Sequence, residues 1–165
     1  AHLGVRVIGV VGSEEKAEMA KANGCQHVLL SSDPDIPNRV RSLTGGRGVP
    51  VVFDSVGKDT FDLSLRCLRP RGLMVSYGSS SGSVPPLDIF TLNRLGSLSV
   101  TSAAFAWFVP NREELLMRAA DVVDVVLRKA VKIHVCQQFP LQDAALAHRA
   151  IESRKTIGST VLIPE

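Results

Sequence analysis

Short apolar runs alternate with amphipathic stretches along this chain, and this alternation constrains the fold more than any other feature. Residues 5–11 form a Val- and Ile-rich run that predicts a buried strand, and residues 13–23 have the spacing and the Ser13 N-cap of a helix. Strands that alternate with helices of about ten residues indicate βαβ units. We therefore expect an α/β fold, a doubly wound, Rossmann-like parallel sheet with helices on both faces. The expected strands are residues 5–11, 27–30, 49–54, 72–77, 98–101 and 160–163, and the expected helices are residues 13–23, 36–43, 58–68, 112–129 and 144–153.

The beginning of the chain departs from that architecture. Residues 1–4 look like the end of a helix that runs into the first strand, whereas a doubly wound nucleotide domain starts with a strand, a glycine-rich turn and a helix. Neither the G-x-G-x-x-G nor the G-x-x-x-x-G-K-[ST] pattern occurs in the sequence. We therefore expect a domain that is truncated at its N-terminus and lacks its first strand and its glycine-rich turn.

Composition excludes several classes of partner. The chain has 19 Lys and Arg against 16 Asp and Glu, so its net charge of +3 over 165 residues gives a weak field. Aromatic residues make up only 5%, which disfavours a stacking platform for nucleic acid, and no long apolar run could cross a bilayer. Three separated cysteines without a C-x-x-C pair predict neither disulfides nor a metal site. We expect no nucleic acid, membrane or metal as a partner, and a reducing, cytoplasmic location.

Ligands of open α/β sheets bind where loops follow the carboxyl ends of the strands, and the first such loop here contains Gly12 and Ser13. An acidic residue at this strand tip would bind the 2′-hydroxyl of NAD, whereas a nearby basic residue would accept the 2′-phosphate of NADP. The strand ends without an acid, and Lys16 follows in the first turn of the expected helix, so the pattern favours NADP. The alternative is that Lys16 is a solvated surface residue.

Two later loops are rich in small polar residues. Residues 54–57 form either a simple turn or a backbone surface for the adenosine end of a cofactor. Residues 78–82 match G-x-S-x-G with Ser80 at the centre, but a nucleophile elbow enters a helix at once, which Pro85 and Pro86 prevent. The loop is better interpreted as flexible surface, or as a segment whose small residues let a cofactor approach the backbone. The least favoured interpretation is a serine hydrolase, which would draw its other triad members from His134, His148 and Asp143.

Five segments carry a family resemblance: residues 9–17, 43–46, 52–57, 72–82 and 152–159. In this order they resemble the quinone oxidoreductases, the zinc-free, zeta-crystallin-like branch of the medium-chain dehydrogenase/reductase superfamily, and the similarity covers nearly the whole chain. Members of this family are longer enzymes in which a catalytic domain precedes the nucleotide-binding domain, with NADPH in the cleft between them. The resemblance implies hydride transfer from NADPH to a quinone or a related conjugated carbonyl.

The resemblance also assigns parts of the chain to domains. Residues 1–130 would be the nucleotide-binding domain without its first strand and turn, and residues 131–165 would be a C-terminal segment of the catalytic domain. Without that turn the pyrophosphate of the cofactor loses a helix N-terminus, so we expect the chain alone to bind NADPH weakly and to be weakly active or inactive. No catalytic residue is assigned to this chain.

The cofactor implied by the resemblance is NADP(H), and its binding residues carry over one by one. Ser31 stands where several relatives have a Tyr beside the adenine, so a stacking contact is lost there. The residues carried over are Gly12, Ser13, Lys16 and Ser31 around the 2′-phosphate, the adenine ribose and the adenine, Ser55 and Val56 beside the adenosine, Tyr77, Gly78, Ser79 and Ser80 along the pyrophosphate and nicotinamide ribose, Ala104 and Phe105 near the nicotinamide, and Arg154 from the C-terminal segment.

Residues 96–101 match the segment through which the family dimerises. An exposed edge strand at this place would need a partner, so we expect a homodimer. An alternative from a different class is a non-catalytic dimerising or nucleotide-sensing module derived from such an enzyme.

Overall fold

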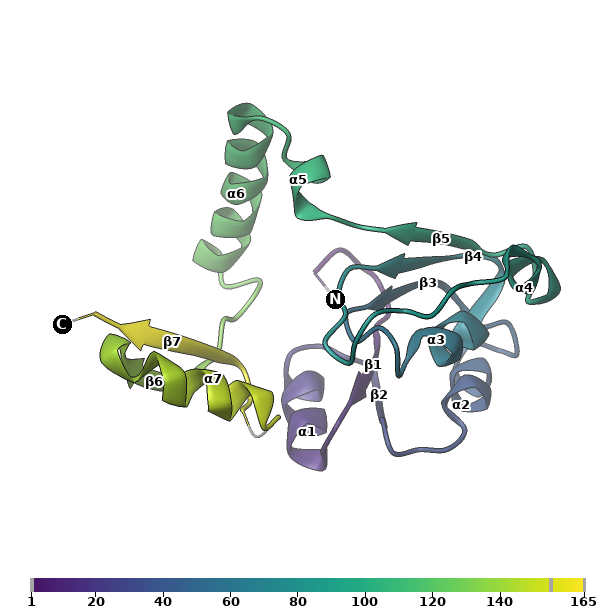
Figure 1. The fold of residues 1–165 in the computed structure, drawn as a ribbon, viewed down its shortest axis with the longest axis horizontal. Helices are drawn as coiled ribbons and strands as arrows, with labels where there is room; N and C mark the ends of the chain where they lie inside the picture. Colours follow the sequence, from purple (N-terminus) through teal and green to yellow (C-terminus); the bar gives the residue numbers. More distant parts are fainter. Residues whose placement is uncertain (1, 155, 165) are drawn as a thin grey trace. The chain divides into compact units, whose positions relative to one another are not determined.

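The structure is a computed structural model that describes residues 2–154 and 156–164. Lys155, within the segment 152–159 that resembles the quinone oxidoreductases, lies outside the described residues. The chain divides into two compact units, one formed by residues 1–28 and 116–165 and the other by residues 29–115. Figure 1 draws the helices and strands of the chain with their labels.

The first unit holds two strand–helix–strand segments. Strand β1 (Ile8–Val11) leads into α1 (Glu14–Ala22), and β1 pairs with β2 (His27–Leu30), whose second half belongs to the other unit. Near the end of the chain, β6 (Val135–Pro140) and β7 (Ser159–Ile163) pair in parallel. Their connection consists of the 3₁₀ helix η1 (Leu141–Asp143) and helix α7 (Ala144–Glu152). Helix α6 (Arg112–Leu127) precedes them, and its residues 112–115 belong to the other unit.

Helix α1 begins directly after β1 because its cap is encoded locally. The Ser13 Oγ accepts a hydrogen bond from the backbone N–H of Lys16 at 3.3 Å, which satisfies one of the free amides of the first turn. Gly24 follows the helix with a φ of +90°, a conformation that glycine adopts without a steric penalty. These two ends place Lys16 just beyond the carboxyl end of β1.

The second unit is built on a three-stranded parallel sheet in the order β3-β4-β5. Helix α3 connects β3 to β4 and packs on them, and the core formed in this way includes Leu65 at 2% exposure and Met74 at 0%. Full burial of a side chain of this size stabilises the fold by about 1.5–3 kcal/mol. The elements of this unit are α2 (Ile36–Leu43), β3 (Val49–Asp54), α3 (Phe61–Cys67), β4 (Leu68–Ser76), α4 (Ile89–Arg94), β5 (Ser99–Ser102) and α5 (Phe105–Phe108).

The parallel α/β organisation expected from the sequence is confirmed, with differences at particular elements. Strand β4 begins at Leu68 instead of residue 72, because Leu68 is buried and pairs with Val49 across a register shift. Arg71, which follows Pro70 within β4, has a left-handed φ of +60°. Helix α3 is shorter than expected because residues 57–60 form a turn, in which the Thr60 N–H donates to the Gly57 carbonyl at 3.0 Å.

In the part of the chain that the structure describes, four elements lie where no element was expected, namely the α-helices α4 and α5, the 3₁₀ helix η1 and the strand β6. The two α-helices have six and four residues and bury none of them, so they leave little periodic signal. Among the described residues, every helix is too short or too polar to cross a bilayer.

Candidate functional site

The first unit brings Lys16 against the end of helix α7. The half-buried Lys16 side chain extends from the first turn of α1, and its Nζ donates a hydrogen bond to the backbone carbonyl of Arg154 at 2.9 Å. Arg154 follows α7 at a φ of +58°, and Gly12 and Ser13 form the turn between β1 and α1. Gly12, Ser13 and Lys16, expected around the 2′-phosphate and ribose, therefore belong to one unit together with Arg154, the cofactor residue expected from the C-terminal segment.

The turn between β1 and α1 lies at the N-terminus of a helix, and the charged side chains beside it are Glu14, Glu15 and Lys16. No carboxylate ends β1, and the acidic residues Glu14 and Glu15 come only in the first turn of α1, where they are exposed. The free amides and the dipole of a helix N-terminus favour an anion nearby. The Lys16 ammonium adds a full positive charge within the same turn.

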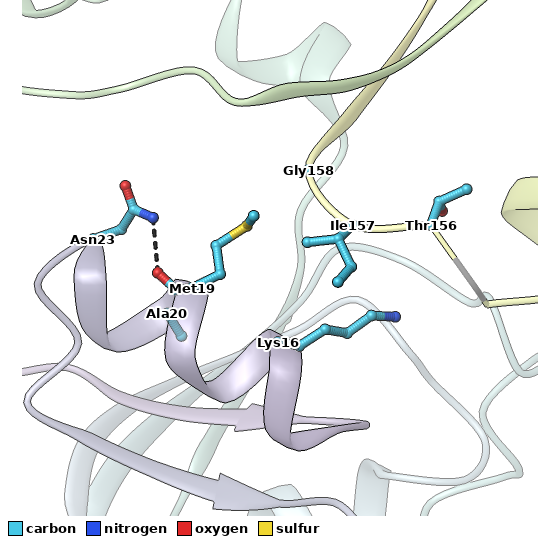
Figure 2. Close-up of a pocket in the computed structure, with 7 residues that line it drawn as sticks. All are labelled: Lys16, Met19, Ala20, Asn23, Thr156, Ile157 and Gly158. Atoms are coloured by element: carbon cyan, nitrogen blue, oxygen red, sulfur yellow. Dashed lines mark hydrogen bonds between the residues drawn. The ribbon is translucent and has the colours of Figure 1, made fainter.

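An open pocket of 360 Å³ lies beside Lys16, within the first unit (Figure 2). Figure 2 shows the Lys16 side chain reaching from α1 toward the segment that contains Thr156 and Ile157. Gly158 closes this segment, and a Cβ there would lie 2.5 Å from the His134 carbonyl oxygen, so a side chain has no room. The lining residues are Lys16, Met19, Ala20, Asn23, Thr156, Ile157 and Gly158.

In the second unit, the loop after β3 and the loop after β4 are bonded to one another. The Tyr77 N–H donates to the Asp54 carbonyl at 2.9 Å, and the Ser81 N–H donates to the Val56 carbonyl at 2.8 Å. The Ser81 Oγ donates to the same Val56 oxygen at 2.8 Å, and the Ser80 N–H donates to the Ser55 carbonyl at 3.4 Å. We refer to residues 54–57 and 77–82 as the paired loops.

Glycine is required where the paired loops touch. A Cβ at Gly78 would lie 2.5 Å from the Ser55 carbonyl oxygen, and a Cβ at Gly57 would lie 2.7 Å from the Gly82 carbonyl oxygen. Real Cβ atoms essentially never come this close to other atoms. Packing between the loops therefore accounts for these glycines without a ligand.

Asp54 is a buried residue of this region that the sequence analysis did not single out. Its Oδ1 accepts from the amides of Val56 at 2.8 Å and Gly57 at 3.0 Å, and the Thr60 hydroxyl donates to both carboxylate oxygens. The Ser64 hydroxyl donates to its Oδ2 at 2.7 Å. The available signal was an Asp at the end of an apolar strand with turn residues behind it, which is typical of an Asx turn.

The pKa of the Asp54 carboxyl reflects this environment. Burial opposes the charge and alone would raise the pKa, but the hydrogen bonds from Ser64, Gly57, Thr60 and Val56 outweigh it and hold the pKa below its ordinary value. Asp54 is only 4% exposed, so it is a buried carboxylate that stays ionised at neutral pH.

The remaining expected site residues lie on exposed loops of the second unit. Ser31 follows β2, Tyr77 is 55% exposed, and Ser79 is also exposed. Ala104 caps α5, and Phe105 begins it at 71% exposure. The unit thus presents these residues to solvent and holds Ser55, Val56 and Gly78 at the contact between the paired loops.

Ser80 lacks the local geometry of a nucleophile elbow. After β4 the chain enters no helix until α4 begins at Ile89, whereas an elbow turns from strand into helix at the nucleophile itself. Ser80 is exposed, and its backbone N–H is used in the contact between the paired loops. The hydrolase alternative is therefore not favoured.

Comparison with known proteins gives a consistent result. The profile of the zinc-binding dehydrogenase family matches residues 1–121. The 2-haloacrylate reductase of a Burkholderia species is 44% identical in an alignment that covers 99% of this chain and 50% of that protein. The chain spans about half the length of the curated relatives it matches.

Solved structures agree with the sequence relatives. A mycobacterial protein complexed with NADPH superposes with a TM-score of 0.95 at 44% identity, over 99% of this chain and 51% of that one. The Escherichia coli quinone oxidoreductase complexed with NADPH gives a TM-score of 0.94 at 42% identity, over 98% of this chain and 50% of that one. This chain, with its α/β, Rossmann-like fold, therefore belongs to the zinc-binding dehydrogenase family of the medium-chain dehydrogenase/reductase superfamily.

Proposed function

We propose that this chain is the nucleotide-binding part of an NADPH-dependent quinone oxidoreductase. Its reaction would be hydride transfer from NADPH to a quinone or a related conjugated carbonyl. Relatives named as quinone oxidoreductases are 41–42% identical across 98% of the chain, and two structures of 42–44% identity contain NADPH. The 2-haloacrylate reductase relative favours a halogenated acrylate as the second candidate acceptor.

The observation that carries the cofactor assignment is Lys16 at the start of α1. An ammonium group has more N–H donors than the single Arg154 carbonyl uses, so Lys16 can bind a phosphate without leaving its place. The free amides of α1 and the absence of a carboxylate at the end of β1 also suit a 2′-phosphate better than a 2′-hydroxyl.

We assign the described residues to the cofactor as follows. Bound NADPH supplies the hydride, and the residues of this chain bind and orient it. Gly12, Ser13 and Lys16 would hold the 2′-phosphate and adenine ribose, with Ser31 near the adenine, and Arg154 would reach the cofactor from the C-terminal segment. In the paired loops, Ser55 and Val56 would flank the adenosine, and Tyr77, Gly78, Ser79 and Ser80 would line the pyrophosphate and nicotinamide ribose. Ala104 and Phe105 would lie near the nicotinamide.

The domain assignment is part of the same proposal. Residues 1–130 would form the nucleotide-binding domain without its first strand and glycine-rich turn, and residues 131–165 would belong to the catalytic domain. The expected weak NADPH binding and weak activity of this chain alone also stay predictions. The expectation that the enzyme uses no zinc also stays a prediction. Among the described residues, no group of three or more His, Cys, Asp or Glu is arranged to hold a metal.

We also propose a homodimer that forms through β5, and a cytoplasmic location. Strand β5 pairs with β4 on one side only, so it is an edge of the three-stranded sheet. Cys25, Cys67 and Cys136 are free thiols, which suits a reducing compartment. A monomeric mass by light scattering at high micromolar concentration would count against the dimer.

The cofactor assignment is tested by calorimetric titration of NADPH and NADH into the wild type and the Lys16→Ala variant. Losing a charge-assisted hydrogen bond to phosphate weakens binding about tenfold or more, so NADPH affinity should fall and NADH affinity should not. Lys21→Ala is the matched control, since Lys21 lies on the same helix and pairs with Glu18 at 2.8 Å. Equal losses for both nucleotides in Lys16→Ala would remove the basis for the assignment, as would a wild-type preference for NADH.

A further inference from the structure

Asp54 connects two parts of the second unit that are distant in sequence. Its carboxylate holds the amides of Val56 and Gly57 on one side and the hydroxyls of Thr60 and Ser64 on the other. These bonds fix the loop after β3 to the start of helix α3 and to its buried face. Because Asp54 is 4% exposed, water cannot easily replace the missing partner if the carboxylate is removed.

The loop fixed by Asp54 in turn hydrogen-bonds to the loop after β4 and holds its backbone. The carbonyls of Asp54, Ser55 and Val56 accept the amides of Tyr77, Ser80 and Ser81. Two more bonds close the arrangement: the Asp59 N–H donates to the Ser81 Oγ at 3.0 Å, and the Lys58 N–H donates to the Gly82 carbonyl at 3.2 Å. The backbone of residues 77–82 therefore takes its shape from a segment that the carboxylate holds.

We propose that Asp54 is a positioning residue for cofactor binding: its carboxylate fixes residues 55–57 and, through them, residues 77–82, so the paired loops keep their binding shape before the cofactor arrives. This rests on the proposed function, in which the paired loops bind NADPH. Asp54 itself is buried and acts through backbone groups of its neighbours. A pre-shaped surface lowers the cost of ordering on binding, so losing it weakens affinity.

Hydrogen–deuterium exchange of the full chain tests the positioning without any ligand. In the wild type, the amides of Val56, Gly57, Tyr77 and Ser81 should open as one cooperative unit, with a common opening free energy. In Asp54→Ala, exchange at Tyr77 and Ser81 should speed up by about tenfold or more. Distinct opening free energies for the two loops in the wild type would refute the proposal even if Asp54→Ala does not fold.

Two further variants separate positioning from stability. Ser64→Ala removes a hydrogen bond to the carboxylate on the helix side, so it should lower stability and leave both the exchange of the paired loops and NADPH affinity near wild type. Asp54→Asn keeps an acceptor oxygen for Val56 and Gly57 and should restore most of the protection and affinity lost in Asp54→Ala. Equal loss of loop protection in Ser64→Ala and Asp54→Ala would assign Asp54 a purely structural role.

NADPH titration of the same variants completes the test. We expect Asp54→Ala to weaken NADPH binding by about tenfold, measured where the protein is fully folded, and Ser64→Ala to leave it unchanged. Unchanged affinity in folded Asp54→Ala would overturn the proposal. If the wild type does not bind NADPH even at nucleotide concentrations high enough to detect the expected weak binding, the proposed function fails, while the exchange experiment still decides whether Asp54 positions the loops.

Discussion

Replacing Gly78 with Ala should separate the paired loops, and the structure gives the size of the effect. The new Cβ would lie 2.5 Å from the Ser55 carbonyl oxygen, 3.0 Å from its Cα and 3.1 Å from its carbonyl carbon. All three are backbone atoms, so no flexible side chain can move aside. Ordinary contact begins at 3.4 Å, so the oxygen and the Cβ must part by 3.4 − 2.5 = 0.9 Å.

That displacement would break hydrogen bonds between the loops. The Ser81 N–H and the Ser81 hydroxyl each donate to the Val56 carbonyl at 2.8 Å, and a shift of 0.9 Å would stretch both beyond bonding range. Two bonds at about 0.5–1.5 kcal/mol each give a loss of about 1–3 kcal/mol, the same range as overpacking in cores. The φ of Gly78 adds no strain, since it lies outside the left-handed region.

Urea unfolding of Gly78→Ala measures this loss as a change in the free energy of unfolding. Gly45→Ala is the matched control, because a Cβ there meets nothing within 4 Å and only its φ of +63° is unfavourable, at a cost of about 1–2 kcal/mol. We expect Gly78→Ala to lose loop protection at Ser81 in hydrogen exchange, and Gly45→Ala to keep it. If Gly78→Ala is as stable as the wild type with full protection at Ser81, the steric reasoning is wrong.

Two further predictions concern titratable groups. Burial alone would raise the pKa of Asp54, but its hydrogen bonds outweigh burial and lower the folded-state pKa. The ionised carboxylate therefore stabilises the fold above the unfolded-state pKa, and this contribution is lost as the pH falls below about 4. Asp54→Asn should show a flatter dependence of the unfolding free energy on pH in that range, and an unchanged slope would contradict this. Burial raises the pKa of the Cys67 thiol to about 11, so Cys67 should resist iodoacetamide at pH 8 while the exposed Cys136 reacts. Peptide mass mapping of the alkylated protein measures this, with Cys136→Ser as the control. Rapid labelling of Cys67 in the folded protein would refute the prediction.

The sequence predicts best those elements whose ends are marked by local residues. The bounds of β2, α2 and β3 agree with the structure because turn residues flank each of them, as Gly45, Gly46 and Gly48 do between α2 and β3. Strand β6 was not predicted because its sequence, Val-Cys-Gln-Gln-Phe-Pro, lacks a clear alternation of apolar and polar residues. It forms a strand through parallel pairing with β7. Propensity alone cannot report a partner strand that lies more than twenty residues away.

In the candidate site too, residues placed by local sequence were predictable, and residues placed by distant contacts were not. Lys16 could be placed from sequence because Ser13 and the end of β1 fix the start of α1. Asp54 could not, because its role depends on contacts with Thr60 just before helix α3 and Ser64 within it, and on the approach of a loop some twenty residues later. Likewise, the sequence around Gly78 indicates only a flexible loop, whereas in the structure Gly78 packs so close to the Ser55 carbonyl that a Cβ has no room.

Helix α6 is a sixteen-residue helix that buries none of its residues fully, and most of its large apolar side chains, such as Val122 at 60% and Leu127 at 76% exposure, are exposed. An isolated helix of about this length is only marginally stable in water, since most helices in proteins depend on tertiary packing. On warming, α6 should therefore fray before the sheet of the second unit loosens. Helical circular dichroism would then begin to fall at temperatures where the core around Met74 is still intact, so the melting of this chain should not follow a single transition.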